Sequence, residues 1–263
     1  MLFVFDLDGV LYRDNSIIAG APKTVCYLRK AGHKISFATN NAMLSRKAYV
    51  KKLNNMGFDC TPDEVMASAY AAGLYLKSKR AGGKKVFVVG EKGLQQELKT
   101  AGLKVFTGRS RVSLPKSTAY VVVGLDRKFN YKALKLAREY IEKGAKLIAT
   151  NKDYTYPGKG GIFPGGGSLV AAVEAASGVE AFVIGKPMPF MLNKLREINQ
   201  IKSKDTIVVG DRYDTDIVFG KRAKTKTIMV LTGVTSKKEA LKYNGKARPD
   251  LILKSVCDLK KYY

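Results

Sequence analysis

Histidine is almost absent from this sequence: His33 is the only one among 263 residues. It lies in a predicted helix-to-strand turn, where a surface histidine near a helix C-terminus is far more common than a catalytic one. Catalytic triads built on histidine and metal sites with several histidines are therefore excluded. Acid–base chemistry has to come from carboxylates, and any bound metal should be a hard, oxygen-preferring ion such as Mg²⁺.

Cysteines and long apolar runs are also scarce. The three cysteines, Cys26, Cys60 and Cys257, are far apart and have no paired metal-ligand spacing, which indicates reduced thiols. No apolar run approaches the ~18 residues that a bilayer span needs, and no charged-then-apolar leader precedes Asp6. We therefore expect a cytoplasmic protein without membrane contacts.

Acidic residues are outnumbered, since 22 Asp and Glu stand against 47 Lys and Arg, for a net charge of +25. Nucleic-acid-binding proteins can have such a balance. However, the lysines are scattered in pairs such as Lys51-Lys52 and Lys84-Lys85 and form no stripe with interleaved aromatic residues. We interpret them as a solvated surface that also steers anionic substrates, and we expect no nucleic-acid partner.

Short β-branched runs alternate with amphipathic stretches along the chain. Strands are predicted at Leu2–Phe5, Lys34–Thr39, Lys85–Val89, Ala119–Val123, Lys146–Thr150, Ala181–Ile184, Thr206–Val209, Thr227–Leu231 and Asp250–Leu253. Helices are predicted at Pro22–Ala31, Ser45–Met56, Tyr131–Lys143, Gly167–Ser177 and Pro189–Asn199. Strands separated by helices imply βαβ units, so we expect an α/β fold with a largely parallel sheet.

Two stretches break this alternation and suggest a domain boundary. Residues 79–85 are polar and rich in glycine, and a second break comes at residues 176–180. The segment between them has strands and helices of its own and is long enough for a small α/β domain. We therefore predict a discontinuous core, 1–78 and 182–263, with residues 79–181 inserted as a second domain.

The first predicted strand ends in two carboxylates, Asp6 and Asp8. Residues i and i+2 of a strand point to the same side, which places these acids about 7 Å apart on one face. Two acids at the end of a buried parallel strand need a cation or a proton to share. The C-terminal ends of such strands are also where open α/β sheets bind ligands. This is the first indication of an active site.

Three more strand ends carry polar groups. Thr39 and Asn40 offer a hydroxyl, an amide and the start of a helix, which suits an anion, although a helix N-cap is the commoner role. Lys186 follows another strand and can act as a point charge on a phosphate. Asp211 and Asp216 follow a fourth strand and could hold a divalent cation. Each feature alone favours a structural role, but the four together, in this order, indicate one site.

The same motifs carry a family resemblance. Asp6-Leu7-Asp8-Gly9, Thr39-Asn40, Lys186 and Gly210-Asp211 with Thr215-Asp216 resemble the four motifs of the haloacid dehalogenase superfamily. The long insert between the second and third motifs is similar to the C2-type cap of the NagD-like, or p-nitrophenyl phosphatase-like, branch. The resemblance implies a Rossmann-like parallel-sheet core with an inserted smaller α/β cap domain, and the activity of a phosphomonoesterase that uses Mg²⁺.

The resemblance also implies roles for the acids. Asp6 would be the nucleophile that forms an aspartyl-phosphate, and Asp8 would protonate the leaving alcohol and then activate water. Mg²⁺ would bind the side chains of Asp6 and Asp211 and the backbone carbonyl of Asp8, with Asp216 in support.

The remaining core residues of the motifs would bind the phosphoryl group. Thr39, Asn40 and Lys186 would contact its non-bridging oxygens, where charge gathers in the transition state.

The inserted domain would set the substrate range. Its best candidate for a specificity loop contains Asn151, Asp153, Tyr154 and Tyr156, in a glycine-rich stretch that could equally be a hinge. A large cap favours a small phosphorylated metabolite, and cap-mediated homodimers occur in this branch. Two alternatives stay open at this stage: phosphoryl transfer to an acceptor other than water, and a basic nucleic-acid-binding protein with vestigial acids.

Overall fold

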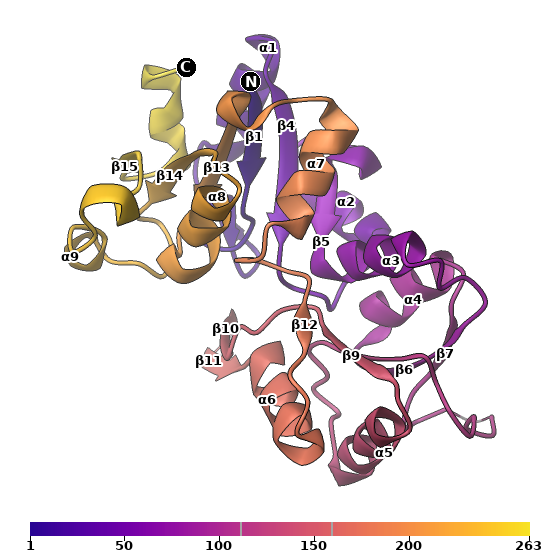
Figure 1. Cartoon of the computed structure of the whole chain (residues 1–263). Coiled ribbons are helices and arrows are strands. Elements are labelled where there is room, and N and C mark those ends of the chain that lie inside the picture. Colours follow the sequence, from indigo (N-terminus) through magenta and orange to yellow (C-terminus); the bar gives the residue numbers. More distant parts are fainter. Residues whose placement is uncertain (111, 159) are drawn as a thin grey trace. The chain divides into compact units, whose positions relative to one another are not determined.

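The computed structural model describes residues 1–110, 112–158 and 160–263, and the chain divides into two compact units. The first unit consists of Met1–Thr39, Tyr49–Met66 and Lys186–Tyr263. The second unit consists of Asn40–Ala48 and Ala67–Gly185. Both chain ends belong to the first unit (Figure 1). There Tyr263 packs edge-on against Phe3.

A six-stranded sheet forms the centre of the first unit, in the order β15-β14-β13-β1-β4-β5. Its strands are β1 (Leu2–Phe5), β4 (Lys34–Thr39), β5 (Val65–Ala67), β13 (Thr206–Gly210), β14 (Lys226–Val230) and β15 (Leu251–Leu253). The pairs β1–β4, β1–β13, β13–β14 and β14–β15 are parallel. Every residue of β1 and β13 is buried, as their unbroken apolar sequences require.

Helices connect these strands and cover the sheet. They are α1 (Ala21–Lys30), α2 (Arg46–Asn55), α7 (Phe190–Asn199), α8 (Val218–Arg222) and α9 (Lys237–Ala240), and a π-helical turn, η3 (Tyr213–Ile217), precedes α8. In α1 the buried residues Ala21, Thr24, Val25 and Leu28 recur at helical spacing, so one stripe faces the sheet. A small hairpin, β2 (Tyr12–Arg13) and β3 (Ser16–Ile17), follows β1 almost directly.

The second unit contains its own five-stranded sheet, in the order β12-β9-β8-β6-β7. Its strands are β6 (Lys85–Val89), β7 (Lys104–Phe106), β8 (Tyr120–Val123), β9 (Lys146–Ala149) and β12 (Phe182–Val183), all paired in parallel. Its helices are α3 (Ser68–Ser78), α4 (Lys92–Thr100), α5 (Tyr131–Glu142) and α6 (Gly166–Ser177). An antiparallel hairpin, β10 (Thr155–Gly158) and β11 (Gly161–Pro164), precedes α6 (Figure 1).

The predicted fold class is confirmed, because both units are built on parallel sheets with helical connections. All nine predicted strands are present within a residue or so of their expected bounds, as are the five predicted helices. The sequence did not predict the short elements β2, β3, β5, β7, β10 and β11, nor helices α3, α4, α8 and α9. Along the described part of the chain, no helix combines the length and apolar character that crossing a bilayer would require.

Candidate active site

The polar residues of the first unit gather where the order of the sheet reverses. β1 lies between β4, from the N-terminal part of the chain, and β13, from its C-terminal part. Such a reversal leaves a crevice at the C-terminal ends of the strands, where open α/β sheets bind ligands. Asp6 follows β1, Asp211 follows β13, and Thr39 ends β4. Residues far apart in the sequence therefore meet at one edge of the sheet.

Three carboxylates form a compact cluster at this edge. One oxygen from each of Asp6, Asp211 and Asp216 lies within 4.8 Å of the others. Asp216 comes from η3, and the Arg212 backbone N–H donates to its Oδ2 at 3.1 Å. Gly210 makes room for it, because a Cβ at this position would lie 2.1 Å from the Asp216 Cβ. Three hard oxygen donors at this spacing fit a divalent cation such as Mg²⁺.

Lys186 is the cation that the protein itself brings to the cluster. Its side chain is almost fully buried, and its Nζ donates to Asp6 Oδ1 at 2.5 Å and to Asp216 Oδ1 at 2.7 Å. A third bond, at 3.2 Å, goes to the Ala38 carbonyl at the end of β4. All three donor positions of the ammonium group are thereby occupied. One lysine still leaves three carboxylates short of positive charge.

That charge deficit is visible in the pKa values. Burial raises the pKa of Asp6 well above its ordinary value, and the neighbouring Asp216 and Asp211 raise it further, against the effect of Lys186. Burial, followed by Asp216, raises the pKa of Asp211 to about 7. Burial alone would lower the pKa of Lys186, but Asp216 and Asp6 raise it above its usual range. A bound cation would reverse this balance and keep all three acids ionised.

Asp8 lies outside this cluster and has a different environment. Burial raises the pKa of its carboxyl group to about 6, while the Lys52 charge and the Asp14 backbone N–H oppose the rise. Lys52 extends from α2 over the Tyr12 ring, 3.9 Å from its centroid, and donates to the Asp14 carbonyl at 3.1 Å. A carboxyl group with a pKa near neutrality can both donate and accept a proton at physiological pH.

The two residues expected at the end of β4 have separate partners. Thr39 is buried and forms a hydrogen bond with Tyr49 of α2. The Asn40 side chain belongs to the second unit, where its Nδ2 lies 3.0 and 3.2 Å from the two Asp153 carboxylate oxygens. Its backbone carbonyl accepts from Ser68 Oγ at 2.5 Å and Asn151 Nδ2 at 2.8 Å.

A small cavity of about 50 Å³ lies within the second unit. Of the residues predicted for a specificity loop, Asn151, Asp153 and Tyr156 line it, together with Asn40. The fourth, Tyr154, is not among its lining residues, and its side chain is 66% exposed. At about 10–15 Å³ for one water-sized group, the cavity accommodates an organic group of only a few atoms.

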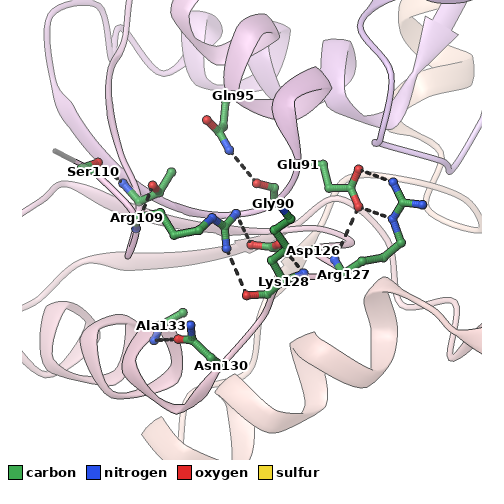
Figure 2. A network of polar contacts seen from close by, with 11 residues as sticks. Gly90, Glu91, Gln95, Arg109, Ser110, Asp126, Arg127, Lys128, Asn130 and Ala133 are labelled. Carbon is green, nitrogen blue, oxygen red and sulfur yellow. Dashed lines mark hydrogen bonds and ion pairs between the residues drawn. The ribbon is translucent and has the colours of Figure 1, made fainter.

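The loop beside this cavity, residues 124–130, is held by two ion pairs. Arg109 donates to the buried Asp126 carboxylate at 2.9 Å, and Arg127 donates to both oxygens of Glu91 at 2.6 and 3.0 Å. Figure 2 shows both pairs, together with the Asn130 cap on α5. Leu125 of this loop also lines the cavity, so its wall is fixed on this side.

Several residues of the site were not predicted from the sequence. Tyr49 and Lys52 are three residues apart on α2, Tyr49 buried and Lys52 half-buried, and a helical wheel of the predicted helix would have placed them on the same side. Leu125 follows a predicted strand end, which was a usable signal.

The fold and site together define a class of enzyme: a phosphate-ester hydrolase built on parallel sheets, with paired acids after β1 and a lysine and further acids after later strands. Models of two haloacid dehalogenase-like hydrolase families match the chain, one described as "Haloacid dehalogenase-like hydrolase" over residues 3–104 and one as "HAD-hyrolase-like" over residues 183–259. The chain belongs to the haloacid dehalogenase-like hydrolases, in the branch of NagD and the p-nitrophenyl phosphatases.

Three similar proteins illustrate the match. Phosphoglycolate phosphatase 1A of Arabidopsis thaliana is 36% identical over 97% of this chain and 75% of its own length. The p-nitrophenyl phosphatase from Archaeoglobus fulgidus has a TM-score of 0.90 at 30% identity, covering 100% of this chain and 98% of its own. The glycerol phosphate phosphatase from Mycobacterium tuberculosis, solved in complex with magnesium, has a TM-score of 0.87 at 32% identity, covering 98% of this chain and 75% of its own. The chain is therefore a phosphatase of this family.

Proposed function

We propose that the protein hydrolyses small phosphomonoesters with Mg²⁺ as its cofactor, through an aspartyl-phosphate intermediate. The observation that carries the proposal is the cluster of Asp6, Asp211 and Asp216, with the Lys186 ammonium group bonded to two of them. The magnesium complex of a similar phosphatase supports the choice of metal.

Asp6 and Asp211 would hold the metal through their side chains, Asp8 through its backbone carbonyl, and Asp216 directly or through water. When bound, Mg²⁺ supplies positive charge that offsets the three carboxylates and the phosphate dianion. Lys186 would neutralise a phosphoryl oxygen, and Thr39 and Asn40 would contribute further donors.

Asp6 would carry out the first chemical step. One of its carboxylate oxygens attacks phosphorus, a P–O bond to the aspartate forms, and the P–O bond to the alcohol breaks. Asp8 gives its proton to the departing alkoxide. In the second step Asp8 takes a proton from water, whose oxygen attacks phosphorus and releases Asp6 and inorganic phosphate. A pKa of about 6 for Asp8 suits both proton transfers near neutral pH.

The small cavity of the second unit supports a short organic group. Its volume of about 50 Å³ and its polar lining from Asn151 and Asp153 favour alcohols of a few carbon atoms. Similar proteins act, by their names, on phosphoglycolate and on glycerol 3-phosphate, both of this size. We propose the same substrate class here, with Asn151, Asp153 and Tyr156 as the residues that contact the organic part.

Cellular setting and assembly complete the proposal. Three free thiols, at Cys26, Cys60 and Cys257, support a reducing compartment such as the cytoplasm. A homodimer through residues 79–181 remains a prediction of the family resemblance, as do the domain limits 1–78 with 182–263 and 79–181.

The test is release of inorganic phosphate from p-nitrophenyl phosphate, phosphoglycolate and glycerol 3-phosphate, each with Mg²⁺ and with EDTA. Asp6→Asn keeps the shape of the side chain and removes the nucleophile. Asp205→Asn, at an exposed position of the same unit, is the matched control. We expect turnover that needs Mg²⁺, is lost in Asp6→Asn and is unchanged in Asp205→Asn.

Two outcomes would contradict the proposal. A folded parent protein that binds Mg²⁺ but releases no phosphate from any ester would refute hydrolysis. Phosphate release that falls when glycerol is added, with a new phosphorylated product in its place, would assign phosphoryl transfer instead.

A further inference from the structure

A four-residue turn outside the family motifs contacts Asp211, one of the three clustered acids of the first unit. This segment, residues 232–235, connects β14 to α9 and leaves the sheet beside Gly210, which pairs with Met229 of β14. It is anchored at both ends. The Leu231 N–H donates to the Leu253 carbonyl at 3.0 Å, and Ser236 caps α9 through a reciprocal pair of bonds with Glu239.

The segment fixes the carboxylate of Asp211 by hydrogen bonding. The Val234 backbone N–H donates to Asp211 Oδ2 at 2.7 Å, and the Thr235 N–H donates to the Asp211 carbonyl at 3.3 Å. Asp211 is only 2% exposed, so little water competes for these bonds. The orientation of the Asp211 carboxylate is therefore set by this segment.

Gly233 brings the segment against this carboxylate more closely than any other residue could. A Cβ at this position would lie 1.8 Å from Asp211 Oδ2 and 2.3 Å from its Cγ. The backbone of Gly233 is not in the left-handed region, so conformation alone does not demand glycine. Glycine is required because the Asp211 carboxylate leaves no space for a side chain at this position.

The same segment also contacts the loop that carries the nucleophile. Thr232 Oγ1 donates to the Gly9 carbonyl at 2.6 Å, and the Arg13 guanidinium group donates to the Thr232 carbonyl. Gly9 in turn lies against Asp211, since a Cβ there would be 2.6 Å from Oδ2. The segment therefore connects the ends of β1 and β13, which supply Asp6 and Asp211.

We propose that segment 232–235 is a positioning element that orients Asp211 relative to Asp6 and thereby sets the affinity for the divalent cation. The proposal rests on the proposed function, because that function assigns a cation to these acids. Gly233 acts through its lack of a side chain, Val234 through its backbone N–H, and Thr232 through its hydroxyl group. None of them has a chemical role in the proposed reaction steps.

The test is Gly233→Ala, with Gly82→Ala as the matched control. Gly82 has open space around its Cβ position and no left-handed backbone. Mg²⁺ binding is measured by titration calorimetry, and melting is followed in EDTA and in Mg²⁺. We expect Mg²⁺ to bind about 10–100-fold more weakly to Gly233→Ala, as for other residues that orient metal ligands, and unchanged in Gly82→Ala. The Mg²⁺ concentration for half-maximal turnover should rise by the same factor, with kcat recovered at saturation.

A folded Gly233→Ala protein that binds Mg²⁺ within about twofold of the parent would overturn the positioning role, since this is far below the effect of a ligand-orienting residue. If this variant does not fold, Thr232→Val decides, because it removes one hydrogen bond at constant shape. Loss of that bond should weaken Mg²⁺ binding about 2–10-fold, and unchanged binding would overturn the proposal. A parent protein that binds no Mg²⁺ would instead refute the proposed function.

Discussion

Replacement of Lys186 by methionine tests the electrostatic core of the site. The change keeps the length and much of the volume of the side chain and removes its charge. The lost interactions are two charge-assisted hydrogen bonds, at 2.5 Å to Asp6 and 2.7 Å to Asp216, from a side chain only 4% exposed. Each such bond contributes about 1.5–3 kcal/mol, and breaking a buried pair costs about 3–5 kcal/mol in total.

Calorimetry and phosphate release measure the two consequences. For a chain of this size a loss of about 3–5 kcal/mol lowers the melting temperature by about 6–20 °C. Loss of the positive charge on the phosphoryl oxygens should lower kcat by about 10²–10³-fold. Because Mg²⁺ supplies charge to the same acids, it should raise the melting temperature of the variant more than that of the parent.

Lys194→Met is the matched control for this experiment. Lys194 pairs with Glu197 at 2.6 Å on α7, but Glu197 is 68% exposed, and such pairs contribute only about 0.3–0.5 kcal/mol. We expect its melting temperature and activity to match the parent. If Lys186→Met were as stable and as active as Lys194→Met, the electrostatic account of the site would be wrong.

Three further predictions follow from burial and hydrogen bonding. Asp6→Asn should lower turnover by about 10⁴-fold or more. In EDTA at pH 7 it should raise the melting temperature, because it removes a buried charge. A lower melting temperature would contradict the burial of Asp6 among like charges. Without metal, the folded protein holds protons on Asp8 that the unfolded chain releases, since its pKa is raised from 3.8 to about 6. Asp8 alone should therefore lower the stability in urea by about 3 kcal/mol as the pH rises from about 4 to about 7, and a rise in stability would refute this sign. Asn151→Ala, which deletes a 4% exposed side chain with bonds to Asn40, Thr150 and Asp153, should cost about 1–3 kcal/mol in urea unfolding, against no change for the exposed Asn244→Ala.

Much of the fold was predictable because buried parallel strands have a simple sequence signature. Leu2–Phe5 and Lys34–Thr39 have the predicted bounds, since apolar runs must be covered on both sides and end where polar groups begin. The same signature placed Asp6 and Asp211 at strand ends. The two-residue strands β2 and β3 have no such run, because Tyr12 is the only one of their four residues that is buried.

The rest of the site depends on contacts between distant residues, which periodicity does not encode. Asn40 appeared suited to an anion, but the structure pairs it with Asp153, more than a hundred residues later. Tyr154 and Tyr156 looked equivalent in sequence, yet only Tyr156 lines the cavity, because Tyr154 precedes β10 and its side chain is 66% exposed. Segment 232–235 carries no acid, base or long side chain, so nothing in its composition indicated a role.

The close packing around the acids changes where mutations matter. Gly9, Gly210 and Gly233 have no side chain to react or to bind, yet a single added carbon at any of them would collide with Asp211 or Asp216. A survey that replaced only charged and polar residues would pass over all three. The least variable positions of this site should therefore include residues that contribute nothing but room.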